Sequence, residues 1–344
     1  MPRLSRRSFV QRAGLTALAA PFATPLAAQV ARDTDSVPGT VMTVKGAVAA
    51  ADLGMTLVHE HVLVDFVGAD AVSAERYDRD AAFRRALPFL REIRALGVRT
   101  LVECTPAYLG RDPQLLLRLS QASDLHIVTN TGYYGAANDK FVPAHAFKET
   151  AEQLAARWTR EAGEGIVGTD VRPGFMKIGV DSGPLSPIDR KLVEAAAITC
   201  KVTGLPIASH TGDGVAAHAE MDVLESAGVA LEAFIWVHAQ SEKDGDVIVR
   251  GAKRGAWISL DGVSAASAPR HASLVGAIAE AGLLDRVLLS HDAGWYRVGE
   301  PEGGAYRPHT DMFTHLLPRL RDLLGEDAVT RLLTLNPARA LARR

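Results

Sequence analysis

The sequence predicts a (β/α)8 barrel, an α/β fold in which eight parallel strands alternate with covering helices. From Val41 onward, short β-branched or apolar runs alternate with longer amphipathic stretches, and this pattern is typical of repeated β/α units. Eight such runs fit into about 300 residues, which favours one closed TIM barrel over a doubly wound sheet.

The eight runs are expected to form the barrel strands in chain order. They span residues 56–65, 99–106, 126–134, 174–181, 206–212, 234–240, 256–263 and 287–294. Residues 30–54 precede them and are predicted to form a small leading segment or hairpin.

Amphipathic stretches between these runs are long enough to form the covering helices. They include residues 144–162, 187–203, 218–227, 269–281 and 310–324. Several stretches end at a glycine just before the next strand, where a left-handed helix cap is expected, as at Gly97, Gly204, Gly228 and Gly282. No linker-like segment divides residues 29–344, so we expect one (β/α)8 barrel domain there.

Residues 1–28 have the layout of a signal peptide rather than of a folded domain. They carry four arginines and no acidic residue, followed by an apolar run and small residues at Ala27 and Ala28. The segment Ser5-Arg6-Arg7-Ser8-Phe9-Val10 resembles the twin-arginine export motif, and a basic amphipathic helix is the alternative. The apolar run is too short to span a bilayer. We therefore expect a periplasmic or secreted protein without a stable membrane anchor.

The overall composition is that of an ordinary globular protein, with 47% hydrophobic and 23% charged residues. The formal net charge is -2, so no excess of basic residues indicates binding to nucleic acid. A small neutral or weakly charged substrate fits this balance better. The two cysteines, Cys104 and Cys200, lie in apolar runs and are interpreted as buried thiols.

Polar side chains follow several of the predicted strands and indicate a metal site. His59 and His61 are two positions apart, so both imidazoles point to the same face of a strand. Lys177 lies inside an apolar run, where an unpaired ammonium is costly; a carboxylate partner or an outward orientation is the alternative. His210, His238 and Asp292 end three further strands. Any one of them alone could be a core residue, but the ends of barrel strands converge on one face.

This ordered set resembles the amidohydrolase superfamily and, within it, the phosphotriesterase-like (phosphotriesterase/lactonase) family. The resemblance runs over about Val41–Arg344 and is carried by Gly54-Met55-Thr56-Leu57-Val58-His59-Glu60-His61, Gly110-Arg111-Asp112, residues 174–179 and Leu289-Ser290-His291-Asp292. It implies two divalent metal ions. The more buried ion would be bound by His59, His61 and Asp292, and the more exposed one by His210 and His238. Lys177 would bridge them as a carbamate, N6-carboxylysine.

The resemblance also implies a mechanism. A metal-bridging hydroxide would attack an ester or lactone carbonyl or a phosphoester, with Asp292 as proton acceptor and His238 or His291 as relay. Zinc is favoured for a site rich in histidine, and manganese, cobalt and iron also fit. Dimerisation is implied only because relatives often form dimers. His126, His145, His218, His271, His309 and His315 are interpreted as structural, the last four within helical patterns.

Two positions bear on the substrate. Tyr134 matches a tyrosine that contacts the substrate oxygen in lactonases of this family, and packing in the barrel rim is the alternative. Gly262 follows Asp261 where such lactonases usually carry an arginine, which weakens a specific lactonase assignment. We rank lactone or other carboxylic ester hydrolysis first, phosphotriester or phosphodiester hydrolysis second and amide hydrolysis third. A non-catalytic periplasmic binding barrel is the alternative of another class.

Overall fold

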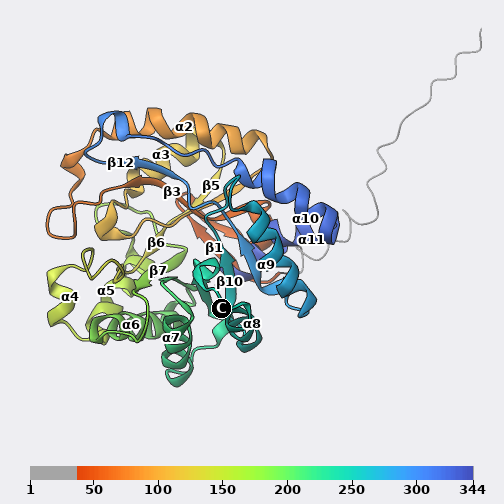
Figure 1. Ribbon diagram of the computed structural model, residues 1–344. Coiled ribbons are helices and arrows are strands. Elements are labelled where there is room, and N and C mark those ends of the chain that lie inside the picture. The colour runs from red at the N-terminus through yellow and green to blue at the C-terminus, as the bar shows by residue number, and fades with distance from the viewer. Residues whose placement is uncertain (1–36, 344) are drawn as a thin grey trace, which may run out of the picture.

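Parallel strands form the barrel wall in residues 37–343, the part of the chain that the computed structural model describes (Figure 1). In order around the wall they are β3 (Thr56–Val64), β4 (Thr100–Glu103), β5 (His126–Val128), β6 (Asn130–Thr131), β7 (Phe175–Val180), β8 (Ile207–Thr211), β9 (Phe234–Val237), β10 (Trp257–Leu260) and β11 (Val287–Leu289). β5 and β6 are two halves of the third barrel strand. The residues after β11 close the ring, because Asp292 N donates to His59 O and His61 N to Ala293 O. The predicted (β/α)8 class is confirmed.

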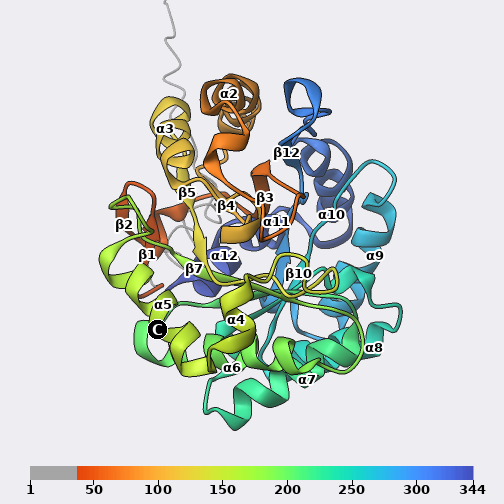
Figure 2. The same cartoon turned by 90° about the vertical axis from the view of Figure 1, so that its left-hand side faces the viewer.

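Helices cover the outside of this wall, as the view in Figure 2 shows. They are α2 (Arg79–Ala95), α3 (Pro113–Ser123), α5 (Ala151–Glu164), α6 (Pro187–Thr203), α7 (Gly214–Ser226), α8 (Gly245–Arg254), α9 (Ala268–Glu280) and α10 (Leu317–Leu324). α6 shows how the sequence sets their ends. Ser186 and Asp189 form a capping box at its start, and Gly204 adopts φ 71° at its end, a conformation that costs glycine little.

An apolar cluster fills the inside of the barrel and covers the end where its strands begin. A hairpin of β1 (Thr40–Thr43) and β2 (Gly46–Ala49) lies there together with α12 (Leu335–Leu341), which follows α11 (Glu326–Leu333). Their apolar side chains pack against residues inside the barrel such as Phe175 and Trp257. This end is therefore closed by hydrophobic packing, and the opposite end is left for the polar side chains.

Two predicted helical stretches differ from the structure, and one strand was not predicted. The helix expected over 144–162 is two helices, α4 (Ala144–Lys148) and α5, because Thr150 caps a new helix start. The stretch 310–324 begins with a π-helical turn, Met312–Leu316, before α10, and His309 precedes it in a loop rather than in a helix. An additional strand, β12 (Gly294–Arg297), pairs with β3 beyond the eighth barrel strand.

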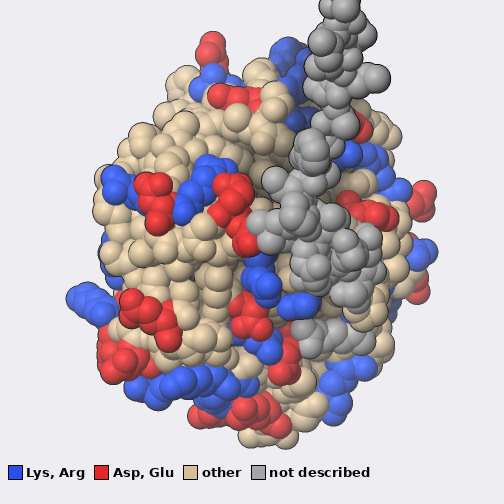
Figure 3. Space-filling model, turned by 90° about the vertical axis from the view of Figure 1, so that its right-hand side faces the viewer, with Lys and Arg blue, Asp and Glu red and all other residues tan. Residues whose placement is uncertain are grey.

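Several general expectations can be compared with the described residues. Cys104 is a buried thiol and Cys200 a partly buried one. Within residues 37–343 no helix has the length and apolar character needed to cross a bilayer. On the face drawn in Figure 3, acidic and basic side chains are interspersed outside the area that grey atoms cover. The predicted signal peptide, residues 1–28, lies outside the described residues.

Candidate metal centre

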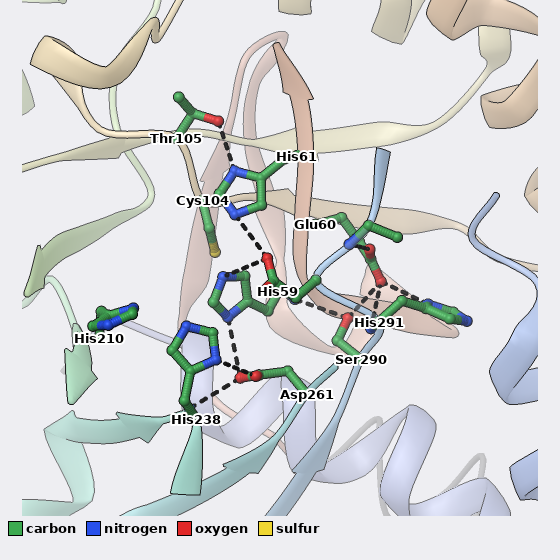
Figure 4. Close-up of polar contacts among 12 residues, drawn as sticks. His59, Glu60, His61, Cys104, Thr105, His210, His238, Asp261, Ser290 and His291 are labelled. Carbon is green, nitrogen blue, oxygen red and sulfur yellow. Dashed lines mark hydrogen bonds and ion pairs between the residues drawn. The ribbon is translucent and has the colours of Figure 1, made fainter. Parts of the chain in front are cut away.

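The side chains predicted to bind metal lie around one cavity of about 310 Å³, at the end of the barrel where the strands finish. They are His59, His61, Lys177, His210, His238 and Asp292, and Tyr134 lines the same cavity. Figure 4 shows the imidazoles of His59 and His61, both on β3, lying near the imidazole of His238, which follows β9. His238 and Asp292 lie just beyond their strands with left-handed φ values of 62° and 51°, which turn both side chains into the barrel mouth.

Asp261 holds two of these imidazoles in one tautomer. Its Oδ2 lies 3.2 Å from His59 Nδ1, and its Oδ1 is hydrogen-bonded to His238 Nδ1. Burial opposes ionisation of Asp261, but the two imidazoles outweigh burial and hold its pKa well below the usual value. An ionised carboxylate only accepts hydrogen bonds, so both Nδ1 atoms carry the proton. The Nε2 atoms of His59 and His238 are then free to bind a metal ion.

Asp292 faces these nitrogen atoms with a carboxylate oxygen. Its Oδ1 lies 3.1 Å from His61 Nε2 and 3.7 Å from His59 Nε2. Burial lowers the pKa of His59, which favours the neutral imidazole, so His59 Nε2 presents a lone pair to a carboxylate. His61 Nδ1 is likewise engaged, 2.7 Å from the hydroxyl of Thr105. Electron-rich atoms that face one another in a buried site fit a bound cation, and His59, His61 and Asp292 have suitable ligand types for a divalent metal.

Lys177 is a buried amine without a carboxylate partner among the described residues. Its side chain is 2% exposed, and its Nζ has one weak hydrogen bond, 3.5 Å from Ile178 O. Burial lowers the pKa of Lys177 and so favours the uncharged amine, although nearby carboxylates oppose this effect. An uncharged amine that points into a metal site is the form that can react with CO2, so the position fits the predicted carbamate.

Tyr134 and His210 form a pair in the wall of the cavity, where the ring centre of His210 lies 4.4 Å from that of His238. The phenol oxygen lies 3.0 Å from His210 Nδ1, and Lys177 Nζ lies 5.3 Å from the centre of the Tyr134 ring. Burial raises the pKa of Tyr134, so the phenol stays protonated and can donate a hydrogen bond. The neighbouring Tyr133 instead packs against Tyr108 and Trp158 in the barrel rim.

Glu60 and His291 form a buried support behind the site. The Glu60 carboxylate accepts hydrogen bonds from His291 Nδ1 at 2.7 Å and from the backbone N–H groups of His291 and Ala293, on either side of Asp292. His309 Nδ1 lies 2.9 Å from the same carboxylate. The other ring nitrogen of His291 accepts from Met312 N. Both His291 nitrogens are therefore engaged away from the cavity, and the predicted relay role of His291 is wrong.

Asp261 contacts two of the predicted ligands, and the sequence interpretation did not include it among the site residues. The signal was present, because Asp261 follows the apolar seventh strand in the same way that His210 and His238 follow theirs. Its partner His59 is 202 positions away in the sequence, so only the fold shows that one carboxylate serves both imidazoles.

Asp261→Asn is expected to lower metal affinity by about 10- to 100-fold. An asparagine amide can donate its N–H to the Nδ1 of one imidazole, whose proton would then move to Nε2. The side chain would no longer hold both imidazoles in the tautomer that leaves Nε2 free to bind metal. Competition with a chromogenic chelator measures the effect. Ser259→Ala is the control, because it removes one 3.1 Å hydrogen bond to Asp261 but keeps the carboxylate. Unchanged affinity in Asp261→Asn would show that Asp261 does not orient the ligands.

Glu220 gives a prediction about stability and pH. It is fully buried on α7, hydrogen-bonded to the hydroxyls of Ser209 and Thr211 on either side of His210. Burial raises its pKa from 4.5 to about 8. The unfolded chain releases this proton at lower pH than the folded protein, so the contribution to stability is complete below pH 4.5 and is lost as the pH rises toward 8.

Glu220→Gln mimics the protonated side chain and should flatten this part of the stability profile. The wild-type protein is expected to lose up to about 1.4 kcal/mol more per pH unit than the variant within that range. Chemical denaturation at several pH values, with metal held constant, measures the difference. Parallel profiles for the two proteins would contradict the prediction.

Comparisons with known proteins agree with this geometry. A family model described as Phosphotriesterase family matches residues 39–341. The chain is 29% identical to the phosphotriesterase homology protein of Escherichia coli (strain K12), over 78% of this chain and 90% of that protein. It is 26% identical to the aryldialkylphosphatase of Saccharolobus solfataricus, over 85% of this chain and 96% of that protein. Among solved structures, a mutant PTE-like lactonase of Deinococcus radiodurans superposes with a TM-score of 0.79 at 29% identity, covering 88% of this chain and 100% of that one.

Proposed function

The chain belongs to the phosphotriesterase family, as its motifs predicted, and from this we propose that it is a binuclear metal-dependent hydrolase of lactones and other carboxylic esters. The family relationship makes it a hydrolase of ester or phosphoester bonds. The main observation in favour of a metal-dependent reaction is the buried cluster in which His59 Nε2 and His61 Nε2 face the carboxylate of Asp292. Such a set of donors is stabilised by a bound cation.

The proposed ligand sets follow the geometry of the cavity. His59, His61 and Asp292 would hold one ion, His210 and His238 a second, and carboxylated Lys177 would lie between them. Two divalent ions held there would supply a nucleophile derived from water near neutral pH and would polarise the substrate oxygen. Zinc suits these ligands, and manganese, cobalt and iron remain alternatives.

The side chains of the protein then have distinct tasks. The Asp292 carboxylate lies beside His59 and His61 and accepts the proton that the attacking water loses. His238 is held by Asp261 and keeps its Nε2 directed into the cavity. Tyr134 remains protonated, so its phenol can donate a hydrogen bond to the substrate oxygen in place of His210.

Tyr134 favours carboxylic esters over phosphoesters, because it lines the cavity, as its match to the lactonase tyrosine requires. The apolar side chains that form much of the wall suit the apolar part of either substrate. Phosphotriester or phosphodiester hydrolysis is the second candidate, because the same nucleophile serves both reactions and the relative from S. solfataricus is named an aryldialkylphosphatase. Amide hydrolysis ranks third.

The first experiment is metal stoichiometry on protein purified without added metal, followed by turnover of a lactone, an aryl ester and an organophosphate. We expect about two metal ions per chain, with activity lost to a chelator and restored by metal. No metal and no turnover, even after reconstitution with zinc, manganese or cobalt and bicarbonate, would favour a non-catalytic binding barrel instead.

Export to the periplasm is part of the proposal and is supported by residues 1–28 alone. A twin-arginine route carries folded proteins, which suits an enzyme that acquires metal before export. Fractionation of cells that produce the full chain, compared with an Arg6→Lys/Arg7→Lys variant, tests the route. Retention of the wild-type chain in the cytoplasm would contradict it.

A further inference from the structure

The walls of the active-site cavity carry a charge pattern that bears on the substrate. Above the metal-binding side chains, the wall is mostly apolar, with Phe66, Leu109, Phe141 and Trp295 among its residues. Phe66 lies between the other two aromatic rings, 6.3 Å from Phe141 and 5.5 Å from Trp295 between ring centres. Apart from the predicted metal ligands, Lys140 is the one lining residue with a formal charge.

The ammonium group of Lys140 is available to a ligand. Lys140 is exposed, and its Nζ lies 5.5 Å from the centre of the Phe141 ring, on the aromatic wall of the cavity. None of the salt bridges among residues 37–343 involves Lys140. Arg297, by contrast, stacks on Trp295 but pairs with Glu300 and does not line the cavity. Lys140 is therefore a positive charge at the cavity that forms no salt bridge within the described chain, although Asp70 and Asp139 lie with it around a neighbouring hollow.

The backbone that carries Lys140 is held from two sides. Ala137, Asn138 and Asp139 all have left-handed φ values, 64°, 54° and 61°. Asp181, after β7, stabilises this turn by accepting hydrogen bonds from Ala137 N at 2.9 Å and Asn138 N at 3.0 Å. On the other side, Lys140 O accepts from Ala69 N at 3.0 Å. Three successive left-handed residues other than glycine are costly, so this turn is maintained by its surroundings.

We propose that Lys140 selects substrates that carry a negative charge, at the end of an apolar segment remote from the scissile bond. This inference rests on the proposed ester hydrolase function and names its substrate class. The ester group would lie among the metal-binding side chains, the apolar segment would contact Phe66, Phe141 and Trp295, and the anionic end would meet the Lys140 ammonium. A carboxylate, sulfonate or phosphate could supply that charge. Because the turn that carries Lys140 is already ordered, substrate binding would cause little further loss of backbone conformational entropy there.

The test compares two substrates with the same leaving group and acyl length. 4-Nitrophenyl hexanoate is neutral, whereas mono-4-nitrophenyl adipate ends in a carboxylate. Lys140→Met removes the charge and keeps the length of the side chain, and Lys140→Glu reverses the charge. Lys253→Met is the control, because it removes an exposed lysine far from the cavity. Lys253 lies in the last turn of α8, which leads into the start of β10, and the strands begin at the end of the barrel opposite the cavity.

We expect Lys140→Met to lower kcat/KM for the adipate ester by about fivefold, through KM, and to leave the hexanoate ester unchanged. Lys140→Glu should lower kcat/KM for the adipate ester further. Added salt should weaken the preference of the wild type for the adipate ester over the hexanoate ester. Lys253→Met should have the same kcat/KM values as the wild type for both esters. Equal effects on both esters, or no effect on either while the hexanoate ester is still hydrolysed, would overturn the inference without affecting the proposed function.

Binding of unreactive analogues keeps the inference testable if neither ester is hydrolysed. Calorimetry with ketone analogues of the two esters, in which a CH2 group replaces the ester oxygen, compares the wild type with Lys140→Met. A preference for the anionic analogue that Lys140→Met abolishes would support the role of Lys140 even where the ester hydrolase proposal fails. Equal binding of the two analogues by the wild type would overturn it.

Discussion

Asp292→Asn is expected to lower kcat by about 100- to 10,000-fold while the protein stays folded and still binds metal. The amide keeps the size of the side chain and one oxygen that can bind metal, but it cannot accept the proton of the attacking water. Asparagine also tolerates the left-handed backbone at this position, where φ is 51°, so the substitution adds little strain. The loss should therefore fall on the chemical step more than on substrate binding.

Steady-state kinetics with the best substrate of the panel measure this effect, together with circular dichroism and metal content. Asp322→Asn is the matched control, because Asp322 is exposed on α10 and remote from the barrel mouth. Near-normal kcat in Asp292→Asn would remove Asp292 as the proton acceptor. A fall in kcat that merely follows a loss of bound metal would assign Asp292 to metal binding alone.

The strand pattern and the side chains that line the cavity could be predicted from the sequence for one physical reason. Barrel strands are buried on both faces, so each is a short apolar run, and several polar side chains in or after such runs indicate a site because the strand ends converge on one face. His210 and His238 follow this rule, and the structure places both beside the cavity. The left-handed caps at Gly204 and Gly282 follow equally local rules.

The parts that could not be read depend on contacts between distant residues. Glu60 is next to two predicted ligands, but its partner His291 is 231 positions away, and only closure of the barrel brings them together. The relay role assigned to His291 failed for this reason, because proximity in sequence to Asp292 does not show which way a ring points. The Lys140 turn depends on Asp181, 44 positions away from Ala137, so its left-handed residues have no local sequence signal.

Lys177→Ala is expected to reduce bound metal well below the wild-type content and to lower kcat by several orders of magnitude. If the carbamate joins both ions, the substitution removes a negative charge and a shared ligand from the site. Lys177 is only 2% exposed and has no carboxylate partner among the described residues, so no neighbouring side chain replaces the carbamate. The substitution also leaves a space that a small carboxylic acid can enter. Acetate or propionate should therefore restore part of the metal content and activity.

Lys177→Met is the matched control for this rescue. Methionine also lacks the amine, but it fills most of the same volume, so an added carboxylic acid has no room to bind. Metal analysis and kinetics on both variants, with and without carboxylic acid, separate the chemistry of the bridge from its packing. Rescue of Lys177→Ala and not of Lys177→Met would support a carboxylated Lys177. Full metal content in unsupplemented Lys177→Ala would show that the histidines and Asp292 hold the ions without it.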